Sequence, residues 1–224
     1  MKNKIETIAH IENDFTEKFG VPRQSGMADT ISKIVFEPKY RVLEAFRGLD
    51  EFSHIWILWL FSEVNTDDWS PTARPPILGG NKRMGVFATR SPFRPNSIGM
   101  SSVKIHSIDI NSKDGPVIYV QGADLMNGTP IIDIKPYLPF TDSHPEATGG
   151  FTDYSKKENL KVIIPDNLQK KISSAKLHSL KSLLQLDPRP GYQNDPGRVY
   201  KMSFGEYEVH FSVDNTTLTV LNIT

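Results

Sequence analysis

Cysteine is absent from the 224-residue chain, which excludes disulfide bonds, thiolate metal ligands and a cysteine nucleophile. No metal site is expected. Long apolar runs are absent too: the longest, Ile55–Phe61, has seven residues, against roughly 20 needed to cross a bilayer. A run of that length favours a strand buried on both faces. The polar N-terminus has no apolar signal core, so we expect a cytoplasmic protein that does not bind membranes.

A third absence is local, because no Asp or Glu occurs between Ser70 and Ile108. Six basic residues fall in this stretch: Arg74, Lys82, Arg83, Arg90, Arg94 and Lys104. The whole chain has 26 basic and 26 acidic residues, so the remainder carries a formal net charge of −6. Proline and glycine are also frequent here, which favours fixed loops. Guanidinium groups on fixed loops indicate a site for phosphate or another polyanion.

Short strand-like runs, separated by turn residues, recur through the first 140 residues. They are Ile5–Ile11, Ile31–Phe36, Ile55–Phe61, Gly85–Thr89, Val103–Ile110, Val117–Gly122 and Pro130–Ile134. Within the same part of the chain, only the segment Tyr40–Phe46 has the spacing of a short helix. Many short strands with few helices favour a mainly β fold, an antiparallel barrel or sandwich, over alternating βαβ units.

The second part of the chain has a different pattern. A polar, Gly- and Pro-containing linker (141–159) precedes Asp166, which is placed to cap a helix that ends at Asp187. Three strand-like runs follow, at Val199–Phe204, Tyr207–Val213 and Thr217–Ile223. We therefore expect two domains, a β domain over residues 1–144 and a smaller α+β domain over 145–224.

Neither a Gly-x-Gly-x-x-Gly turn between strand and helix nor a P-loop occurs in the sequence. The block Gly85–Met100, however, resembles the signature of the tRNA N6-threonylcarbamoyladenosine methyltransferase family. Other segments resemble that family in the same order: Glu17–Gln24, Arg47–His54, Arg74–Asn81, Asp133–Phe140 and, more loosely, Asp187–Tyr192. The resemblance implies an antiparallel β-barrel, which agrees with the strand pattern. It also implies S-adenosylmethionine as methyl donor, the anticodon loop of tRNA as partner, and a homodimer.

The resemblance places cofactor contacts on separated segments. They are Ser25, Gly26, Met27, Ser62, Glu63, Arg90, Met100, Asn127, Gly128, Thr129 and Pro130. In these roles the guanidinium of Arg90 pairs with the cofactor carboxylate, and Glu63 accepts hydrogen bonds from the ribose hydroxyls. The alternatives are a plain turn at Ser25–Met27, a solvated strand end at Ser62 and Glu63, a surface ion pair at Arg90 and a core position for Met100. The family usually has Asp where this chain has Asn127, and Pro where it has Ser97, so a contact that needs a carboxylate at position 127 would be lost.

The implied reaction transfers a methyl group to N6 of threonylcarbamoyladenosine at position 37. Because N6 must lose a proton, a general base is expected. The candidates in matching segments are Asp133, Tyr137 and His54. Each has an ordinary alternative: Asp133 shares a strand face with Lys135 and suits an ion pair, Tyr137 suits packing, and His54 suits a strand edge.

Basic residues in the resembling segments are expected to contact RNA: Lys82, Arg83 and Arg94 in the acid-free stretch, and Arg189 and Arg198 in the second domain, beside Tyr192. Phe87 and Phe93 lie between the basic residues and suit stacking on unpaired bases, or equally a core. Of the two, Phe93 is expected to be the more exposed.

Two other functions fit the same residues. One is a non-catalytic RNA-binding barrel that keeps the basic surface without the methyl donor. The other is a small-molecule enzyme in which Arg90 and Arg94 clamp an anionic substrate. Cofactor binding separates the methyltransferase from the first alternative, and RNA binding separates it from the second.

Overall fold

The computed structural model describes residues 4–64, 69–153, 158–189 and 195–224. Its first part is a closed barrel in which the strands follow the order β1-β2-β7-β6-β3-β8 and every neighbouring pair is antiparallel. The strands are β1 (Ala9–Glu12), β2 (Ile31–Phe36), β3 (His54–Leu60), β6 (Ile98–Asp109), β7 (Val117–Gln121) and β8 (Pro130–Pro136). The mainly β fold predicted from the strand pattern is thereby confirmed.

Strand β3 explains how the barrel is filled. Ile55, Ile57 and Trp59 are buried and point inward, while the alternate residues are only partly buried. The expectation that this run is buried on both faces was therefore wrong, because the outward-facing side chains are only partly covered. Aromatic packing continues the core beyond the strands, where Phe36 meets Phe46 edge-on with ring centroids 4.8 Å apart.

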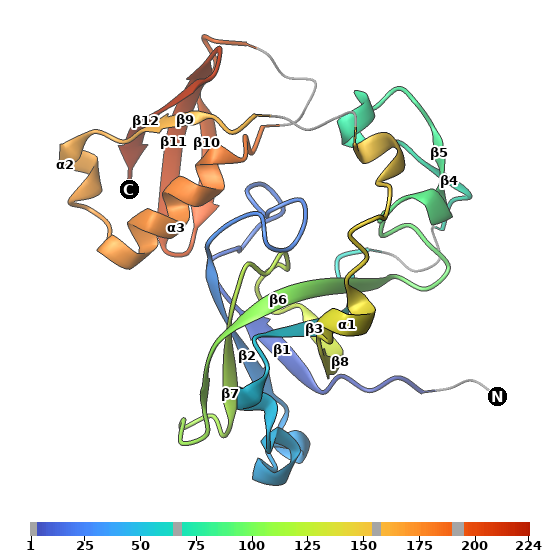
Figure 1. Cartoon of the computed structure of the whole chain (residues 1–224). Coiled ribbons are helices and arrows are strands. Elements are labelled where there is room, and N and C mark those ends of the chain that lie inside the picture. The colour runs from blue at the N-terminus through green and yellow to red at the C-terminus, as the bar shows by residue number, and fades with distance from the viewer. Residues whose placement is uncertain (1–3, 65–68, 154–157, 190–194) are drawn as a thin grey trace.

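Between β3 and β6 the chain leaves the barrel as an arm, residues 70–97, which Figure 1 shows extending away from the barrel strands. The arm carries the two-residue strands β4 (Thr72–Ala73) and β5 (Met84–Gly85), paired with each other. The strand predicted over Gly85–Thr89 is confined to its first residue, because a 3-10 turn occupies Val86–Ala88. The helix predicted over Tyr40–Phe46 is likewise replaced by two 3-10 turns, at Pro38–Tyr40 and Leu43–Phe46.

The second part is a four-stranded sheet in the order β10-β11-β12-β9, and β9 is parallel to β12. Helix α3 packs across this sheet (Figure 1) through Leu180, Leu183 and Leu184. The elements are α1 (Pro139–Asp142), before the domain, and β9 (Lys161–Ile163), α2 (Asp166–Gln169), α3 (Ser174–Gln185), β10 (Tyr200–Phe204), β11 (Tyr207–Asp214) and β12 (Thr217–Ile223) within it.

The single helix expected after Asp166 is two helices. Asp166 is the first residue of α2 and Pro165 occupies the cap position. The chain then breaks, and Ser173 caps α3 by accepting a hydrogen bond from the Lys176 amide at 3.4 Å. A side chain that caps a helix in this way satisfies an amide that the helix itself leaves unpaired.

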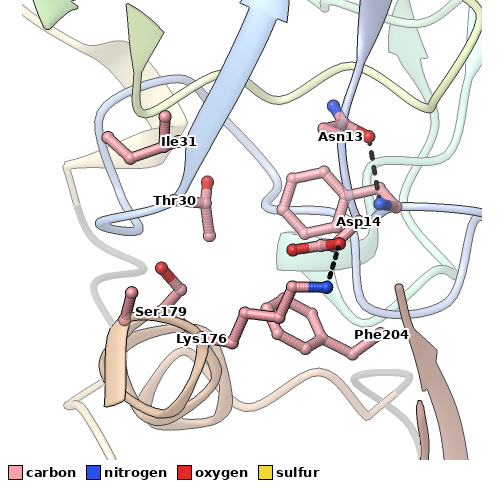
Figure 2. A pocket seen from close by; sticks show the side chains of 9 residues that line it. Asn13, Asp14, Thr30, Ile31, Lys176, Ser179 and Phe204 are labelled. Atoms are coloured by element: carbon pink, nitrogen blue, oxygen red, sulfur yellow. Dashed lines mark hydrogen bonds and ion pairs between the residues drawn. The ribbon is translucent and has the colours of Figure 1, made fainter. Parts of the chain in front are cut away.

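The two parts meet through the β1–β2 loop, as Figure 2 shows. The ammonium of Lys176, on α3, lies 3.2 Å from Asp14 Oδ1 and also bonds Glu206. The Gly205 amide donates to the Asp14 carbonyl at 2.8 Å. A cavity of about 220 Å³ lies beside these contacts, with Phe15 among its walls. Ion pairs and backbone bonds therefore hold the β1–β2 loop to the second domain.

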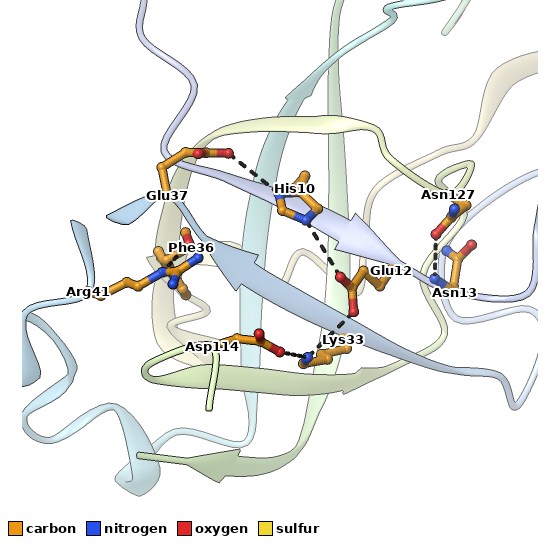
Figure 3. A network of polar contacts seen from close by, with 9 residues as sticks. All are labelled: His10, Glu12, Asn13, Lys33, Phe36, Glu37, Arg41, Asp114 and Asn127. Atoms are coloured by element: carbon orange, nitrogen blue, oxygen red, sulfur yellow. Dashed lines mark hydrogen bonds and ion pairs between the residues drawn. The ribbon is translucent and has the colours of Figure 1, made fainter. Parts of the chain in front are cut away.

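Charged side chains on the outside of the barrel tie its strands together (Figure 3). The Lys33 ammonium, on β2, lies 2.6 Å from Asp114 in the β6–β7 loop and 3.4 Å from Glu12 on β1. The hydrogen bond from Lys33 lowers the pKa of the Asp114 carboxyl, and the same bond raises the pKa of Lys33. The network thus joins three segments that are distant in sequence.

Across the described residues, no helix has both the length and the apolar character that crossing a membrane requires.

Candidate active site

A cavity of about 340 Å³ opens at the end of the barrel where β3 leaves and β6 begins. Its walls come from four separate segments: the β1–β2 loop, the ends of β3 and β6, the arm, and the loop after β7. The lining residues are Pro22, Arg23, Gln24, Trp59, Phe61, Arg90, Arg94, Ile98, Gly99, Met100 and Asp124.

The floor of the cavity is an indole held from two sides. Trp59 packs against Phe61 with ring centroids 4.2 Å apart and the ring planes tilted by 58°. Its Nε1–H donates to Ser101 Oγ at 3.0 Å, and the Ser101 hydroxyl donates to Asp124 Oδ1 at 2.5 Å. Gly99 is required beside it, because a Cβ atom there would lie 2.2 Å from the indole.

Asp124 is the one carboxyl in the described lining of this cavity, and burial raises its pKa above the ordinary value. The Ser101 hydrogen bond, backbone amides of Asp124 and Ser25, and the charge of Arg90 act in the opposite direction. The carboxyl therefore lies in a less polar environment than a surface carboxyl, with donors that fix its orientation.

Three arginines also line the cavity. Arg90 donates to the Gln24 side chain, and Arg94 donates to the Thr89 carbonyl at 3.3 Å. Arg23 donates to two carbonyls of the second domain, those of Asp187 at 3.4 Å and Arg189 at 3.3 Å. The second domain thus holds Arg23 in place, in a cavity whose other lining residues belong to the barrel domain.

Of the cofactor contacts expected from sequence, Arg90 and Met100 line the cavity. The Ser25–Met27 turn adjoins it: the Gly26 amide donates to the Gly122 carbonyl at 2.8 Å, in the loop that leads to Asp124. Gly122 has a φ of +86°, and a Cβ atom on it would lie 3.0 Å from Gly26. Two glycines therefore allow these loops to meet.

The other expected cofactor residues are not in the described lining. Ser62 and Glu63 form an exposed turn directly after Phe61, which does line the cavity. The turn at Asn127 faces the end of β1, where the Asn127 and Gly128 amides donate to the carbonyls of Phe15 and Ile11, both at 2.8 Å. Thr129 is buried and Pro130 begins β8, so this turn also helps to close the barrel.

The three expected proton acceptors lie on the outer face of the barrel. Asp133 pairs with Lys135 at 2.8 Å, which confirms the same-face ion pair. Tyr137 packs against Trp56 with ring centroids 5.6 Å apart and against His54 at 6.2 Å. None of the three is part of the cavity lining.

The arm exposes both charge and aromatic surface. Lys82 and Arg83 are exposed, and Arg83 also donates to Thr72 Oγ1 at 3.0 Å. Phe87 is 79% exposed and Phe93 48% exposed, so the expectation that Phe93 is the more exposed of the pair was wrong. The reason is that Phe87 lies in a 3-10 turn at the surface of the arm.

In the second domain the two expected RNA contacts differ. Arg198 is exposed, with its guanidinium 5.4 Å from the centre of the Tyr200 ring. Arg189 is 7% exposed, and its guanidinium meets the Asp187 carboxylate through two hydrogen bonds of 2.8 and 3.1 Å. This pair holds the loop whose carbonyls accept from Arg23. Tyr192 lies outside the described residues.

Sequence reasoning missed several lining residues: Arg23, Gln24, Trp59 and Asp124. Trp59 was predictable as an inward residue from the alternation in β3. Asp124 gave no such signal, because a single carboxyl in a loop acquires its environment only from strands distant in sequence.

The chain matches two family models, the tRNA-methyltransferase O N-terminal domain over residues 10–143 and the TrmO C-terminal domain over residues 157–224. It is 36% identical to the tRNA (adenine(37)-N6)-methyltransferase of Escherichia coli (strain K12), over 97% of this chain and 96% of that protein. A protein of the same name from Eikenella corrodens is 46% identical over 73% of this chain and 92% of its own length. The crystal structure of TrmO from Pseudomonas aeruginosa superposes with a TM-score of 0.79 at 27% identity, with both chains covered in full.

Proposed function

The chain belongs to the tRNA-methyltransferase O family, and we propose that it transfers a methyl group from S-adenosylmethionine to N6 of adenine 37 in tRNA. The observation that supports this most directly is the cavity, which combines guanidinium groups, an aromatic floor and a partly buried carboxyl at one end of the family's barrel. We propose the threonylcarbamoyl form of the adenosine as substrate. We also propose residues 1–144 as the catalytic domain and 145–224 as the second domain.

The lining suits the methyl donor chemically. Arg90 offers a planar guanidinium, which matches a carboxylate such as that of a methionine group. Trp59, Phe61 and Met100 offer the flat and polarisable surface that an adenine ring packs against. We also propose cofactor contacts from the Ser25–Met27 turn, from Ser62 and Glu63, and from the turn Asn127–Pro130, because these segments adjoin the loops or strands that line the cavity.

When bound, the donor supplies a methyl group already activated by a positively charged sulfur. The protein contributes position: it holds the two reactants in line and excludes water, and such alignment contributes about 7–11 kcal/mol to rate accelerations. The walls come from rigid strands and from loops held by Gly26, Gly122 and the Arg23 contacts to the second domain.

The arm is the proposed RNA surface. Lys82, Arg83 and Arg94 supply positive charge, and Phe87 and Phe93 expose rings on which unpaired bases stack. Arg198 extends the surface on the second domain. Arg189 is left out of this surface because its guanidinium is occupied by Asp187.

A nucleoside assay tests the proposed reaction. Purified protein and S-adenosylmethionine are incubated with tRNA that carries threonylcarbamoyladenosine, and with the same tRNA lacking the modification. Mass spectrometry of the digested nucleosides should show one added methyl in the first and none in the second, because a site built for the carbamoyl group leaves polar groups unpaired without it. Methylation of plain adenosine at a similar rate would contradict the proposed substrate.

A salt titration tests the arm separately. Replacing Lys82 and Arg83 with Gln should lower the slope of log affinity for tRNA against log salt by about 1.4, since each phosphate contact to single-stranded RNA contributes about 0.7. Two exposed lysines outside the arm, Lys4 and Lys113, replaced in the same way, provide the control. A slope unchanged by the arm substitutions would exclude the arm as the RNA surface.

We also propose a cytoplasmic homodimer. The support for the dimer is exposed apolar surface on α1, which contacts the outer face of β3 and carries Phe140, 86% exposed. Light scattering coupled to size-exclusion chromatography should give the mass of a dimer for the wild type and of a monomer for Phe140→Asp. A monomeric wild type would exclude the dimer.

A further inference from the structure

The proton that leaves N6 needs an acceptor, and the cavity contains few groups that can serve. Among the described residues that line it, those with ionisable side chains are Arg23, Arg90, Arg94 and Asp124. Guanidinium groups stay protonated at every pH at which the protein is folded and cannot accept a proton. Asp124 is therefore the one lining group, within the described part of the chain, that can take a proton near neutral pH.

Candidates outside the cavity are less well placed. His54 begins β3 and lies five residues from Trp59, the residue of that strand that lines the cavity. Five residues of extended strand correspond to a separation of roughly 17 Å. Tyr137 accompanies His54 through their ring contact. Asp133 is engaged by Lys135 on the outer face.

The hydrogen bonds around Asp124 fix what its carboxylate can do. The Ser101 hydroxyl accepts from the Trp59 indole, so its single proton is committed to Asp124. A carboxylate has about four lone-pair sites, and the Ser101 hydroxyl occupies one of them on Oδ1. Asp124 also lines the cavity, so lone pairs of its carboxylate remain to accept a proton from a group bound there.

We propose that Asp124 is the catalytic proton acceptor of the methyl transfer and that Ser101 is its positioning residue. This inference rests on the proposed function. As N6 forms its bond to the methyl carbon, the electron pair of the broken carbon–sulfur bond stays on sulfur and the N6 proton passes to the Asp124 carboxylate. The products are the methylated N6, the neutral thioether and a carboxylic acid, so charge and atoms balance.

The surroundings of the Asp124 carboxyl favour its role as a proton acceptor. Burial raises the pKa of the Asp124 carboxyl, which makes its carboxylate a stronger base than that of a surface aspartate. Among the described residues, Arg90 is the charged side chain that acts on it, and Arg23 and Arg94 line the same cavity. The acid limb of the rate profile should therefore report Asp124.

The experiment compares the wild type with Asp124→Asn, Ser101→Ala and a control, Asp50→Asn, which changes an exposed carboxyl in the turn before β3. Single-turnover rates are measured from about pH 4 to about pH 8 with both substrates saturating. Donor affinity is measured by calorimetry and folding by thermal unfolding. Titration of ¹³C-labelled aspartate carboxyls by NMR gives the pKa of Asp124 directly, from the resonance that Asp124→Asn removes.

We expect Asp124→Asn to lower the rate by about 10²–10⁴-fold, the usual range for a general base, with donor affinity and unfolding temperature close to those of the wild type. Ser101→Ala should move the acid limb and the NMR titration together to higher pH, because the lost hydrogen bond had favoured the charged form. Asp50→Asn should behave as the wild type.

Three results would overturn the role of Asp124. One is an unchanged rate in Asp124→Asn. Another is a loss confined to donor affinity, which would make the carboxylate a binding group for the donor's ammonium. The third is an acid limb that stays in place in Ser101→Ala while the NMR titration moves, a result that does not depend on whether Asp124→Asn folds. A wild type that transfers no methyl group would overturn the proposed function itself, and the proton acceptor with it.

Discussion

Gly99→Ala tests how tightly the floor of the cavity is packed. A Cβ atom at position 99 would lie 2.2 Å from Cε2 and 2.4 Å from Cζ2 of Trp59. Movement of the indole is restrained, because it is 7% exposed, bonded to Ser101 and packed against Phe61. We expect the substitution to cost about 1–3 kcal/mol of stability, the range for an overpacked core.

A loss of stability is the opposite of the usual effect of replacing Gly by Ala in a strand, because Ala is otherwise as favourable there as Gly or more so. In a protein of this size about 1 kcal/mol shifts the melting temperature by about 2–4 °C. The melting temperature should therefore fall by about 2–12 °C. Tryptophan fluorescence reports unfolding of the barrel domain, because Trp56 and Trp59 lie in the barrel and Trp69 directly precedes the arm.

Gly85→Ala is the matched control, because no atom lies within 4 Å of its added Cβ and its φ is −56°. Combining Gly99→Ala with Trp59→Phe should recover part of the loss, since the smaller ring vacates the space. Equal melting temperatures for Gly99→Ala and Gly85→Ala would refute the packing argument.

Three further predictions concern contacts that hold the molecule together. The pKa of Asp114 is lowered chiefly by the hydrogen bond from Lys33, so the stability that this carboxylate contributes is present above its unfolded pKa and is lost as pH falls through the folded value. Urea unfolding should thus show that Asp114→Asn is less stable than the wild type at neutral pH and that the gap narrows below about pH 3.8, the ordinary aspartate value. A Cβ atom on Gly205 would lie 2.4 Å from Asp14 Oδ1 and 3.1 Å from Lys176 Nζ, so Gly205→Ala should weaken this contact between the two domains and increase cleavage between them in limited proteolysis. Arg189→Met should lower the melting temperature, because the buried Asp187 carboxylate loses the two hydrogen bonds from the guanidinium, while the salt slope of tRNA binding stays as in the wild type.

Local patterns predicted the strands well where alternation was regular. Ile31–Phe36 and Thr217–Ile223 are strands with the predicted bounds, because β-branched residues and a period of two favour the same structure there. The pattern failed where the backbone is held by local turns, as in the 3-10 turn after Gly85. It also missed β9, whose three residues pair with a strand more than 50 positions later in the chain.

The candidate site was predictable only in part, for a related reason. Arg90 and Met100 were found because their segment resembles a family signature, and both line the cavity. The environment of Asp124 depends on Trp59 and Ser101, which lie on two other strands. Because that environment is created by residues distant in sequence, the residues next to Asp124 in the sequence could not have predicted it.

The order of strands in the second sheet has a consequence for synthesis on the ribosome. Strand β12 lies between β11 and β9, so β9 is translated early and has no partner strand until residues 217–223 emerge. The barrel, in contrast, has all its strands once Pro136 has been made. Because domains fold as units while the chain grows, the barrel can close while the second sheet is still incomplete. Until that sheet closes, Arg23 lacks the carbonyls of Asp187 and Arg189 in their folded positions, and a nascent chain would have its barrel before it has a finished cavity.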